Sequence, residues 1–414
     1  MSAHDLITRA KQSSGTFGMA STQRKNEVLQ TIAKLLTQNL DAILRANHLD
    51  LDRGRDAGLA EGLLDRLELS EKRVTNLSSS VLEVVALPDP IGEVVAGRLL
   101  PNGLRISQLR VPFGLVGVIY EARPNVTVDI AALALKSGNA IVLRGGSAAE
   151  KTNEVLVGLI QNALELNGFS RDLVATVDPY GREGAVAMMQ ARGLVDVLIP
   201  RGSAQLIKTV VTESRVPVIE TGDGVVHLFV DETADLETAT PVIINSKVQR
   251  PSVCNSLETL LVHQSVAEEL LPQLSRELSS LGVTLHGCER SMPLMPGATL
   301  ATDADWATEY LALELSVRIV DSIDDALNHI AKYSTRHTES ILTQEMRNAE
   351  RFLAEVDSAV VMLNASTRFT DGGEFGFGAE VGISTQKLHA RGPMGLNALT
   401  STKWQVRGNG QVRS

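Results

Sequence analysis

The architecture of this protein is set by residues 114–168, "GLVGVIYEARPNVTVDIAALALKSGNAIVLRGGSAAEKTNEVLVGLIQNALELNG". Two short apolar runs, "GLVGVIY" and "NAIVLRG", precede a segment of helical character, "EKTNEVLVGLIQNALELNG". Further runs follow at "LVATVD", "VDVLIPRG" and "VPVIETG". Strands that alternate with helices at this spacing indicate a parallel sheet covered on both faces. The sequence therefore predicts a doubly wound α/β domain of the nucleotide-binding type.

A second α/β domain is expected after Gly224. A new series of apolar runs begins at "VVHLFVD" and continues through "SVRIVDSIDDALNHIAKY" and "SAVVMLNAS". The glycine-rich piece "TDGGEFGFGAEVGIST" is long enough to be a functional loop rather than a simple connection. We find no internal repeat and no low-complexity segment.

The first hundred residues are expected to be helical. Apolar residues in "RKNEVLQTIAKLLTQNLDAILRANHLDL" recur at steps of three and four, which predicts one buried helical face. The members of this face are Val28, Ile32, Leu35, Leu36, Leu40, Ile43 and Leu44.

Asn102-Gly103 indicates a β-hairpin. The pair lies in "GRLLPNGLRISQLRVPFGLVGVIY", between two segments that alternate between apolar and polar residues. A type I′ turn needs positive φ at both central positions, and Asn-Gly is the favoured pair for it. We therefore expect two antiparallel strands joined by such a turn.

Length, charge and cysteine content bound the class of protein. A chain of 414 residues with 43% hydrophobic residues is expected to form two to three globular domains. The net charge is −10, and cationic residues are interleaved with acidic ones, which argues against a nucleic-acid-binding protein. No C-x-x-C or H-E-x-x-H pattern indicates a metal site, and two cysteines cannot build a disulfide framework. With no signal-type apolar core and no apolar run of about 18 residues, the expected location is the cytoplasm.

Three places carry residues suited to chemistry, and each has an alternative interpretation. Gly202 and Ser203, in "IPRGSAQLIKTV", lie between a strand and a helix, where backbone N–H groups favour a phosphate; the alternative is a turn with a serine N-cap. Cys254, with Lys247 and Arg250 upstream, is a candidate nucleophile or a small buried hydrophobe. Glu220 follows a strand and is a candidate general base or an exposed loop carboxylate.

These elements, in this order, resemble the aldehyde dehydrogenase superfamily. The matching segments are "EARPNVT" with Asn125, "GNAIVLRGG" with Arg144, "PRGSAQ", "IETGDG", "VQRPSVCNS", "TEYLALELSV" with Glu309, and "GPMGLNALTSTKWQV". The sequence departs from the general pattern at Asp223, which replaces a glycine, and at Leu399, which replaces a tyrosine.

One branch of that superfamily is matched more closely than the rest. "VDSIDDALNHIAKYSTRHTESI", residues 320–341, together with "LPDPIGEV" and "YEARPNVT", is similar to the gamma-glutamyl phosphate reductase family. His329, His337, Thr338 and Glu339 mark the 22-residue segment. We expect the two histidines to be structural, as most histidines outside demonstrated sites are.

The resemblance implies an aldehyde dehydrogenase-like α/β fold: two doubly wound, Rossmann-like domains plus a small β-hairpin arm. It assigns residues 1–98 and 114–224 to an NADPH-binding domain and residues 225–364 to a catalytic domain carrying the cysteine. Residues 99–113 and 395–414 would form the oligomerisation arm, and residues 365–394 a loop returning to the cofactor domain. A homo-oligomer, dimer or tetramer, is implied.

The implied reaction is the NADPH-dependent reduction of L-glutamyl 5-phosphate to L-glutamate 5-semialdehyde, with release of phosphate, in L-proline biosynthesis. Cys254 would form a thioester, Asn125 and the Cys254 N–H would hold the oxyanion, and Glu220 is a further catalytic candidate. Lys151 lies near Arg144, where both could meet a 2′-phosphate; the alternative is a solvated loop. The implied cofactor-binding residues are Arg144, Gly202, Ser203 and Glu309. The candidates for anchoring the substrate are Arg123, Arg250 and Arg368.

Further expectations concern partners and alternatives. A separate glutamate 5-kinase is expected upstream, and neither a metal, a nucleic acid nor a membrane is expected as a partner. The alternative function is that of an NAD(P)-dependent aldehyde dehydrogenase of other specificity. A catalytically silent binding protein is a third option, but it would be expected to lack Cys254 or Asn125, and both are present.

Overall fold

The computed structural model describes residues 2–413 and divides into two compact units. Unit 1 comprises Met1–Glu220, Gly376–Gly382 and Met394–Ser414, and unit 2 comprises Thr221–Phe375 and Ile383–Pro393. The division after Glu220 lies close to the boundary after residue 224 that the sequence suggested. Both units are α/β structures built on parallel sheets, so the predicted fold class is confirmed.

Unit 1 is built on a four-stranded parallel sheet of order β5-β4-β3-β6. The strands are β3 (Leu115–Tyr120), β4 (Ala140–Arg144), β5 (Val174–Thr176) and β6 (Val197–Arg201). Every residue of β3 is buried, as expected for a strand covered by helices on both faces. The chain moves outward from β3 through β4 to β5 and then returns to β6 on the other side, which creates a switch point between β3 and β6.

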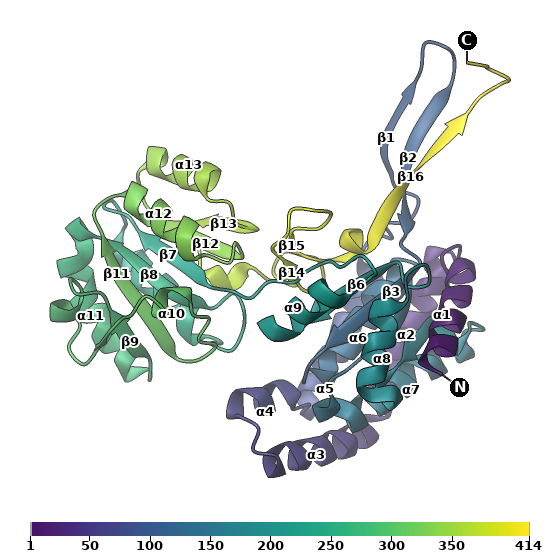
Figure 1. The fold of residues 1–414 in the computed structure, drawn as a ribbon, viewed down its shortest axis with the longest axis horizontal. Helices are drawn as coiled ribbons and strands as arrows, with labels where there is room; N and C mark the ends of the chain where they lie inside the picture. Colours follow the sequence, from purple (N-terminus) through teal and green to yellow (C-terminus); the bar gives the residue numbers. More distant parts are fainter. Residues whose placement is uncertain (1, 414) are drawn as a thin grey trace. The chain divides into compact units, whose positions relative to one another are not determined.

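Helices surround this sheet (Figure 1). They are α1 (Ala3–Phe17), α2 (Thr22–Gln38), α3 (Leu40–Asp56), α4 (Glu61–Leu67), α5 (Glu71–Ala86), α6 (Pro124–Lys136), α7 (Glu150–Leu166), α8 (Gly181–Gln190) and α9 (Ala204–Glu213). Ser2, Ser21 and Ser70 cap the N-termini of α1, α2 and α5, where each side chain accepts a backbone N–H. The expected helical N-terminal region is thus confirmed as the five helices α1 to α5. Within the segment predicted to form one buried face, Asn39, with φ −112° and ψ 24°, separates α2 from α3.

The segment "VPVIETG" does not form the strand that its apolar run predicts. Only an isolated parallel bridge joins Val218 to Leu198 of β6. The Leu198 N–H donates to the Pro217 carbonyl and the Ile219 N–H donates to the Leu198 carbonyl. Pro217 itself has no N–H to contribute, which shortens the ladder.

Three antiparallel strands form an arm that extends away from the parallel sheet of unit 1 (Figure 1). They are β1 (Val94–Leu99), β2 (Arg105–Pro112) and β16 (Thr400–Arg407), in the order β1-β2-β16. The predicted hairpin is therefore confirmed, but the predicted type I′ turn is wrong. Gly103 has φ +83° whereas Asn102 is not among the residues with positive φ, because Pro101 at the preceding position favours an ordinary type I turn closed by one left-handed glycine.

Unit 2 contains a seven-stranded parallel sheet of order β10-β9-β11-β8-β7-β12-β13. The strands are β7 (Val226–Val230), β8 (Leu257–His263), β9 (Thr284–Gly287), β10 (Thr299–Leu300), β11 (Glu314–Val320), β12 (Thr338–Leu342) and β13 (Val360–Leu363). A two-stranded antiparallel ladder joins β14 (Ile383–Ser384) to β15 (Gly392–Pro393).

The helices of unit 2 cover both faces of that sheet (Figure 1). They are α10 (Leu236–Val248), α11 (Gln264–Ser280), α12 (Ile323–Tyr333) and α13 (Met346–Glu355). Leu228 and Val230 of β7 pack with α10 and α11, while Phe229 between them packs with α12 and α13. This alternation follows from the two-residue period of a strand and makes the unit doubly wound. None of the helices within residues 2–413 has the length and apolar character that a membrane span requires.

Candidate functional site

Unit 1 places four of the predicted site residues at the carboxyl edge of its sheet. Arg144 is the last residue of β4, Gly202 and Ser203 follow β6, and Asn125 lies in the first turn of α6, shortly after β3. Because the strands are parallel, their carboxyl ends share one edge of the sheet. The β3–β6 switch point lies at this edge, which is where open α/β sheets bind ligands.

The turn at Gly202-Ser203 holds a carboxylate of the protein itself. The Ser203 N–H donates to Glu121 Oε2 at 2.8 Å, and the Ser203 hydroxyl donates to Oε1 at 3.2 Å. Ser203 also caps α9, since its side chain accepts the Leu206 N–H. The capping role expected as the alternative is therefore present, and phosphate binding stays a prediction. Glu121 was not foreseen as an anion at this helix N-terminus, although its position directly after β3 places it at the switch point.

Arg144 lies beside an unforeseen carboxylate. The Gly145 N–H donates to Asp178 Oδ1 at 2.6 Å, and Arg144 Nη1 donates to the Gly145 carbonyl at 2.7 Å. Burial raises the pKa of Asp178, while the Gly145 hydrogen bond and the Arg144 charge lower it. Within residues 2–413, the buried Arg144 Nε has no hydrogen-bond partner. The Lys151 ammonium is 3.2 Å from Glu154 on the exposed side of α7.

Asn125 is hydrogen-bonded to a carboxylate one helical turn away. Its Nδ2 donates to Asp129 Oδ2 at 3.1 Å. Burial raises the pKa of Asp129 to about 6, although the Asn125 hydrogen bond and the Arg201 charge act in the opposite direction. Asp129 was not foreseen; the four-residue spacing from Asn125 on a helix was the available signal.

Unit 2 places Cys254 in the segment between α10 and β8, against the backbone of Gly224. A Cβ atom at position 224 would lie 1.6 Å from the carbonyl oxygen of Cys254, so only glycine fits there. The Gly224 N–H donates to Glu309 Oε1 at 2.8 Å. Cys254 and Glu309, both predicted from sequence, therefore adjoin the same glycine.

One of the three candidate arginines, Arg368, is electrostatically coupled both to Cys254 and to a second candidate, Arg250. Burial lowers the pKa of Arg368, the charges of Asp371 and Cys254 raise it, and the charge of Arg250 lowers it. Arg368 Nε also donates to Gln249 Oε1 at 2.9 Å. The third candidate, Arg123, belongs to unit 1. Cations beside a thiol favour its reactive thiolate form.

The segment after β13 is tied to the residue that follows Cys254. Asn255 Nδ2 donates to the Thr370 carbonyl at 2.8 Å, and the Thr367 hydroxyl donates to the Asn255 carbonyl at 2.8 Å. These bonds hold the short 3₁₀ helix η6 (Thr367–Phe369), which carries Arg368, against the cysteine segment.

A buried ion pair joins the two ends of the cysteine segment. Lys247 Nζ, in the last turn of α10, is 2.6 Å from Glu258 Oε2 in β8, and both side chains are fully buried. Glu258 Oε1 accepts the Leu311 N–H at 3.2 Å, two residues after Glu309. Burial raises the pKa of Glu258 and lowers that of Lys247, and each partner's charge opposes the shift. From the sequence, Lys247 is identifiable only as a cation upstream of the cysteine.

The family-marking histidines lie in the interior of unit 2. His329 packs edge-on against Trp306 and His227, and its Nδ1 lies 3.3 Å from Arg318 Nη1. Burial, reinforced by the charges of neighbouring residues, lowers the pKa of His329 to about 2. His337 is buried with its Nδ1 2.8 Å from the Thr338 hydroxyl. These are the surroundings of structural histidines.

Glu220 is the last residue of the first segment of unit 1, directly before the chain enters unit 2 at Thr221. It follows Ile219, which runs beside β6 toward the carboxyl edge of the sheet. Its catalytic role stays a prediction. The structure contains, within residues 2–413, no group of three or more histidine, cysteine or carboxylate side chains arranged to hold a metal.

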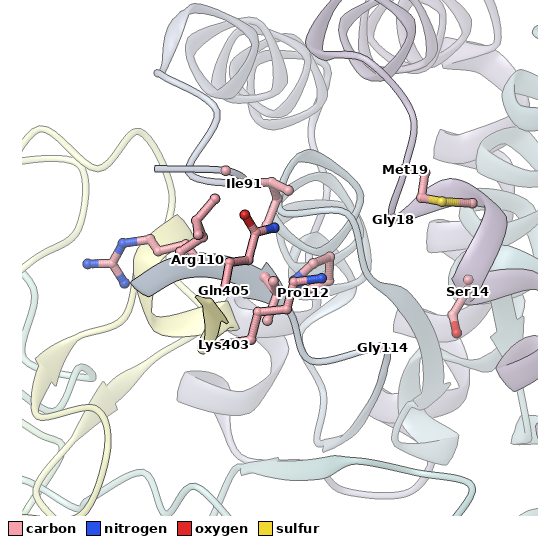
Figure 2. A pocket seen from close by; sticks show the side chains of 13 residues that line it. Ser14, Gly18, Met19, Ile91, Arg110, Pro112, Gly114, Lys403 and Gln405 are labelled. Carbon is pink, nitrogen blue, oxygen red and sulfur yellow. The ribbon is translucent and has the colours of Figure 1, made fainter. Parts of the chain in front are cut away.

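A pocket of about 390 Å³ lies at the base of the arm, away from the predicted site residues. Figure 2 shows Ser14, Gly18 and Met19 at one side and Arg110 and Lys403 of the arm at the other. The Arg110 guanidinium is already engaged, because its Nε is 2.6 Å from Glu93 Oε2. The pocket is lined by Ser14, Gly15, Gly18, Met19, Ile91, Gly92, Leu109, Arg110, Val111, Pro112, Gly114, Lys403 and Gln405.

Comparison with known proteins gives a consistent match. Residues 1–296 match the model of the aldehyde dehydrogenase family. The chain is 60% identical over 410 residues to the gamma-glutamyl phosphate reductase of Leifsonia xyli subsp. xyli, covering 99% of this chain and 97% of that protein. It is 54% identical to that of Thermobifida fusca, with 99% and 98% covered.

Solved structures agree. The crystal structure of gamma-glutamyl phosphate reductase from Thermotoga maritima matches with a TM-score of 0.94 at 46% identity, covering 100% of this chain and 99% of that one. An acetylating aldehyde dehydrogenase from Geobacillus thermoglucosidasius matches with a TM-score of 0.72 at 17% identity, covering 100% and 97%; that likeness is one of fold alone.

Proposed function

This chain belongs to the aldehyde dehydrogenase family, in its gamma-glutamyl phosphate reductase branch, and we propose that it reduces L-glutamyl 5-phosphate to L-glutamate 5-semialdehyde with release of phosphate. The proposed setting is L-proline biosynthesis in the cytoplasm, with a glutamate 5-kinase supplying the acyl phosphate. The observation that supports this chemistry is the position of Cys254. Its carbonyl group lies against Gly224, whose N–H donates to Glu309, and its charge raises the pKa of Arg368.

The proposed first step is covalent. The Cys254 thiolate attacks the γ-carbonyl carbon, a carbon–sulfur bond forms, and the bond to the phosphate oxygen breaks, so phosphate leaves with the electron pair. The family resemblance assigns the oxyanion that develops to the Asn125 amide and the Cys254 N–H. The product of this step is a thioester on Cys254.

NADPH, when bound, supplies a hydride to the thioester carbon. The tetrahedral adduct then collapses, the carbon–sulfur bond breaks, and the semialdehyde is released with regeneration of the thiolate. Phosphate has already departed, so no water needs to be activated. A Glu220 general base is therefore not needed for hydrolysis, and this residue remains a catalytic candidate to be tested.

Residues at the unit 1 edge fit a dinucleotide. The buried Arg144 Nε has no partner within residues 2–413, which suits a phosphate group of the cofactor. The α9 N-terminus at Gly202-Ser203 already holds an anion, the Glu121 carboxylate, as a pyrophosphate site would. Glu309 is assigned to the nicotinamide ribose through the family resemblance. NADPH rather than NADH is proposed on the same ground.

Anchoring of the substrate is assigned to arginine. The substrate carries an α-carboxylate and a phosphate, both of which suit the planar donor fork of a guanidinium. Arg368 is supported by the influence of the Cys254 charge on its pKa, and Arg250 is close enough to Arg368 to lower that pKa as well. Arg123, two residues before Asn125, is the third candidate.

We also propose that the chain forms a homo-oligomer, dimer or tetramer, through its arm. Both β1 and β16 are edge strands, and the arm exposes Val94, Leu99, Trp404 and Val406. Unpaired strand edges and exposed apolar side chains favour association with another chain. Sedimentation of the purified protein tests this directly.

The reaction is tested in reverse. Purified protein is given glutamate 5-semialdehyde, phosphate and NADP⁺, and NADPH formation is followed by absorbance. We expect phosphate-dependent turnover that is abolished in Cys254→Ala and retained in the matched variant Cys288→Ala. Turnover that does not require phosphate would favour the alternative, an NAD(P)-dependent aldehyde dehydrogenase of other specificity. Equal activity in Cys254→Ala would contradict the proposal.

A further inference from the structure

We propose that Asp129 is a positioning residue, which selects the orientation of the Asn125 side-chain amide for the reaction. The inference rests on the proposed function, in which Asn125 donates a hydrogen bond to the oxyanion. Asp129 itself touches neither substrate nor cofactor in this proposal; it acts through Asn125.

The geometry of α6 brings the two side chains together. Residues four positions apart on a helix lie on the same face, and Asn125 Nδ2 donates to Asp129 Oδ2 at 3.1 Å. An ionised carboxylate can only accept hydrogen bonds, so it selects the Nδ2 end of the amide and not the Oδ1 end. The Nδ2 group carries two N–H bonds, and the second remains available to another acceptor.

Orientation matters because the two ends of an amide have opposite character. With Nδ2 fixed on the Asp129 side, Asn125 can offer an N–H to a developing oxyanion. A flipped amide would instead present a carbonyl oxygen, which repels negative charge. Asp129 therefore determines whether Asn125 stabilises or opposes the oxyanion.

The surroundings of Asp129 disfavour its charged form, which is unusual for a residue with a purely structural role. The groups that face Asp129 are Asn125 on its own helix, Arg201 at the end of β6, and Glu380 in the 376–382 segment of unit 1. Burial is the largest influence and penalises the charged form, raising the pKa to about 6. A neutral side chain would avoid that penalty, so the presence of an acid at this position favours a functional explanation.

Protonation of Asp129 removes its preference for one orientation of the Asn125 amide. A neutral carboxylic acid can donate to Oδ1 of Asn125 as well as accept from Nδ2, so both amide orientations become available. Asp129→Asn has the same dual character at every pH. This variant should therefore behave as a permanent mimic of the protonated enzyme.

The test compares wild type with Asp129→Asn in the reverse reaction between pH 5 and 8. Since a complete oxyanion donor is worth roughly two orders of magnitude in rate, a partly misoriented one should lower kcat about tenfold, with KM changed by less than about twofold. The ratio of wild-type to variant kcat should be largest at pH 8 and approach one below pH 6. Asp41→Asn, which removes an exposed charge in the first turn of α3, is the matched control.

A double variant separates positioning from packing. Combining Asn125→Ala with Asp129→Asn should be no slower than Asn125→Ala alone, because Asp129 acts only through that amide. The proposal is overturned if the two effects multiply, if the kcat ratio does not change with pH, or if Asp129→Asn matches wild type at pH 8.

A substrate-independent readout distinguishes this inference from the proposed function. Acylation of Cys254 by p-nitrophenyl acetate passes through an oxyanion but requires neither cofactor nor the proposed substrate. Absence of wild-type turnover with glutamate 5-semialdehyde would refute the proposed function alone. The Asp129→Asn defect should persist in the ester reaction if Asp129 positions Asn125, and an ester reaction unaffected by the variant would refute the positioning role.

Discussion

Lys247 and Glu258 form a fully buried ion pair, with Nζ 2.6 Å from Oε2, that links the last turn of α10 to β8. The eleven-residue separation encloses the segment that carries Cys254. Glu258 also accepts the Leu311 N–H, which connects this pair to the segment that carries Glu309. This one ion pair therefore connects the segments that carry Cys254 and Glu309.

Removing one partner of this pair should be strongly destabilising. Lys247→Met or Glu258→Gln alone leaves the other group buried without its partner, and we expect a loss of about 3–5 kcal/mol in the free energy of unfolding. Replacing both residues with methionine should cost much less than the sum of the two losses. Urea denaturation of the single and double variants measures this coupling, and additive losses would show that the pair is not coupled.

Gly224→Ala should disrupt the cysteine segment. The added Cβ would lie 1.6 Å from the Cys254 carbonyl oxygen, which is backbone and cannot move aside as a side chain can. We expect a destabilisation of about 3 kcal/mol or more and loss of Cys254 alkylation by iodoacetamide. The control is Gly158→Ala in α7, where nothing lies within 4 Å and the substitution should stabilise the helix by about 0.5–1 kcal/mol. Wild-type alkylation in Gly224→Ala would contradict the close approach.

Asp129→Asn should stabilise the protein at high pH while lowering the kcat of the reaction. The pKa of Asp129 rises from 3.8 to about 6 on folding, so the folded state retains a proton that the unfolded state releases in this window. The wild type therefore loses stability as pH rises from about 4 to about 6. Above pH 6 the full loss in the free energy of unfolding, about 1–3 kcal/mol, applies. The gain in the variant should appear in urea titrations at pH 8 and vanish near pH 4. A gain in stability that does not depend on pH would show that Asp129 does not titrate in this way.

Glu121→Gln should increase the affinity for NADPH. The Glu121 carboxylate lies at the α9 N-terminus, 2.8 Å from the Ser203 nitrogen, where it would compete with a cofactor phosphate. A neutral amide interacts less strongly with the helix dipole, by about 0.3–1 kcal/mol, which corresponds to roughly a two- to fivefold lower Kd. Calorimetric titration measures the change, with the exposed Glu71→Gln at the start of α5 as control. Weaker binding in Glu121→Gln would show that the carboxylate assists the cofactor.

Much of this architecture is predictable from local patterns. The three- and four-residue periodicity of α2 and the short apolar runs of β3 and β4 depend on which side chains face the core, and that information lies within a few residues. Asn125 and Asp129 also belong here, because a four-residue spacing on a helix brings two side chains to one face. The hairpin at Gly103 was similarly accessible, although Pro101 changed its turn type.

Other relationships arise only when distant segments meet. Gly224 and Cys254 are thirty positions apart, and their backbones touch because β7 and β8 are neighbours in the sheet. Glu121 reaches Ser203 because β3 and β6 adjoin at the switch point. Strand order is a property of the whole packed sheet, since each pairing depends on the burial of every other strand. The residue types and local elements of this protein are therefore legible in its sequence, while the contacts that orient Cys254 and occupy the α9 N-terminus come from the packing of the complete chain.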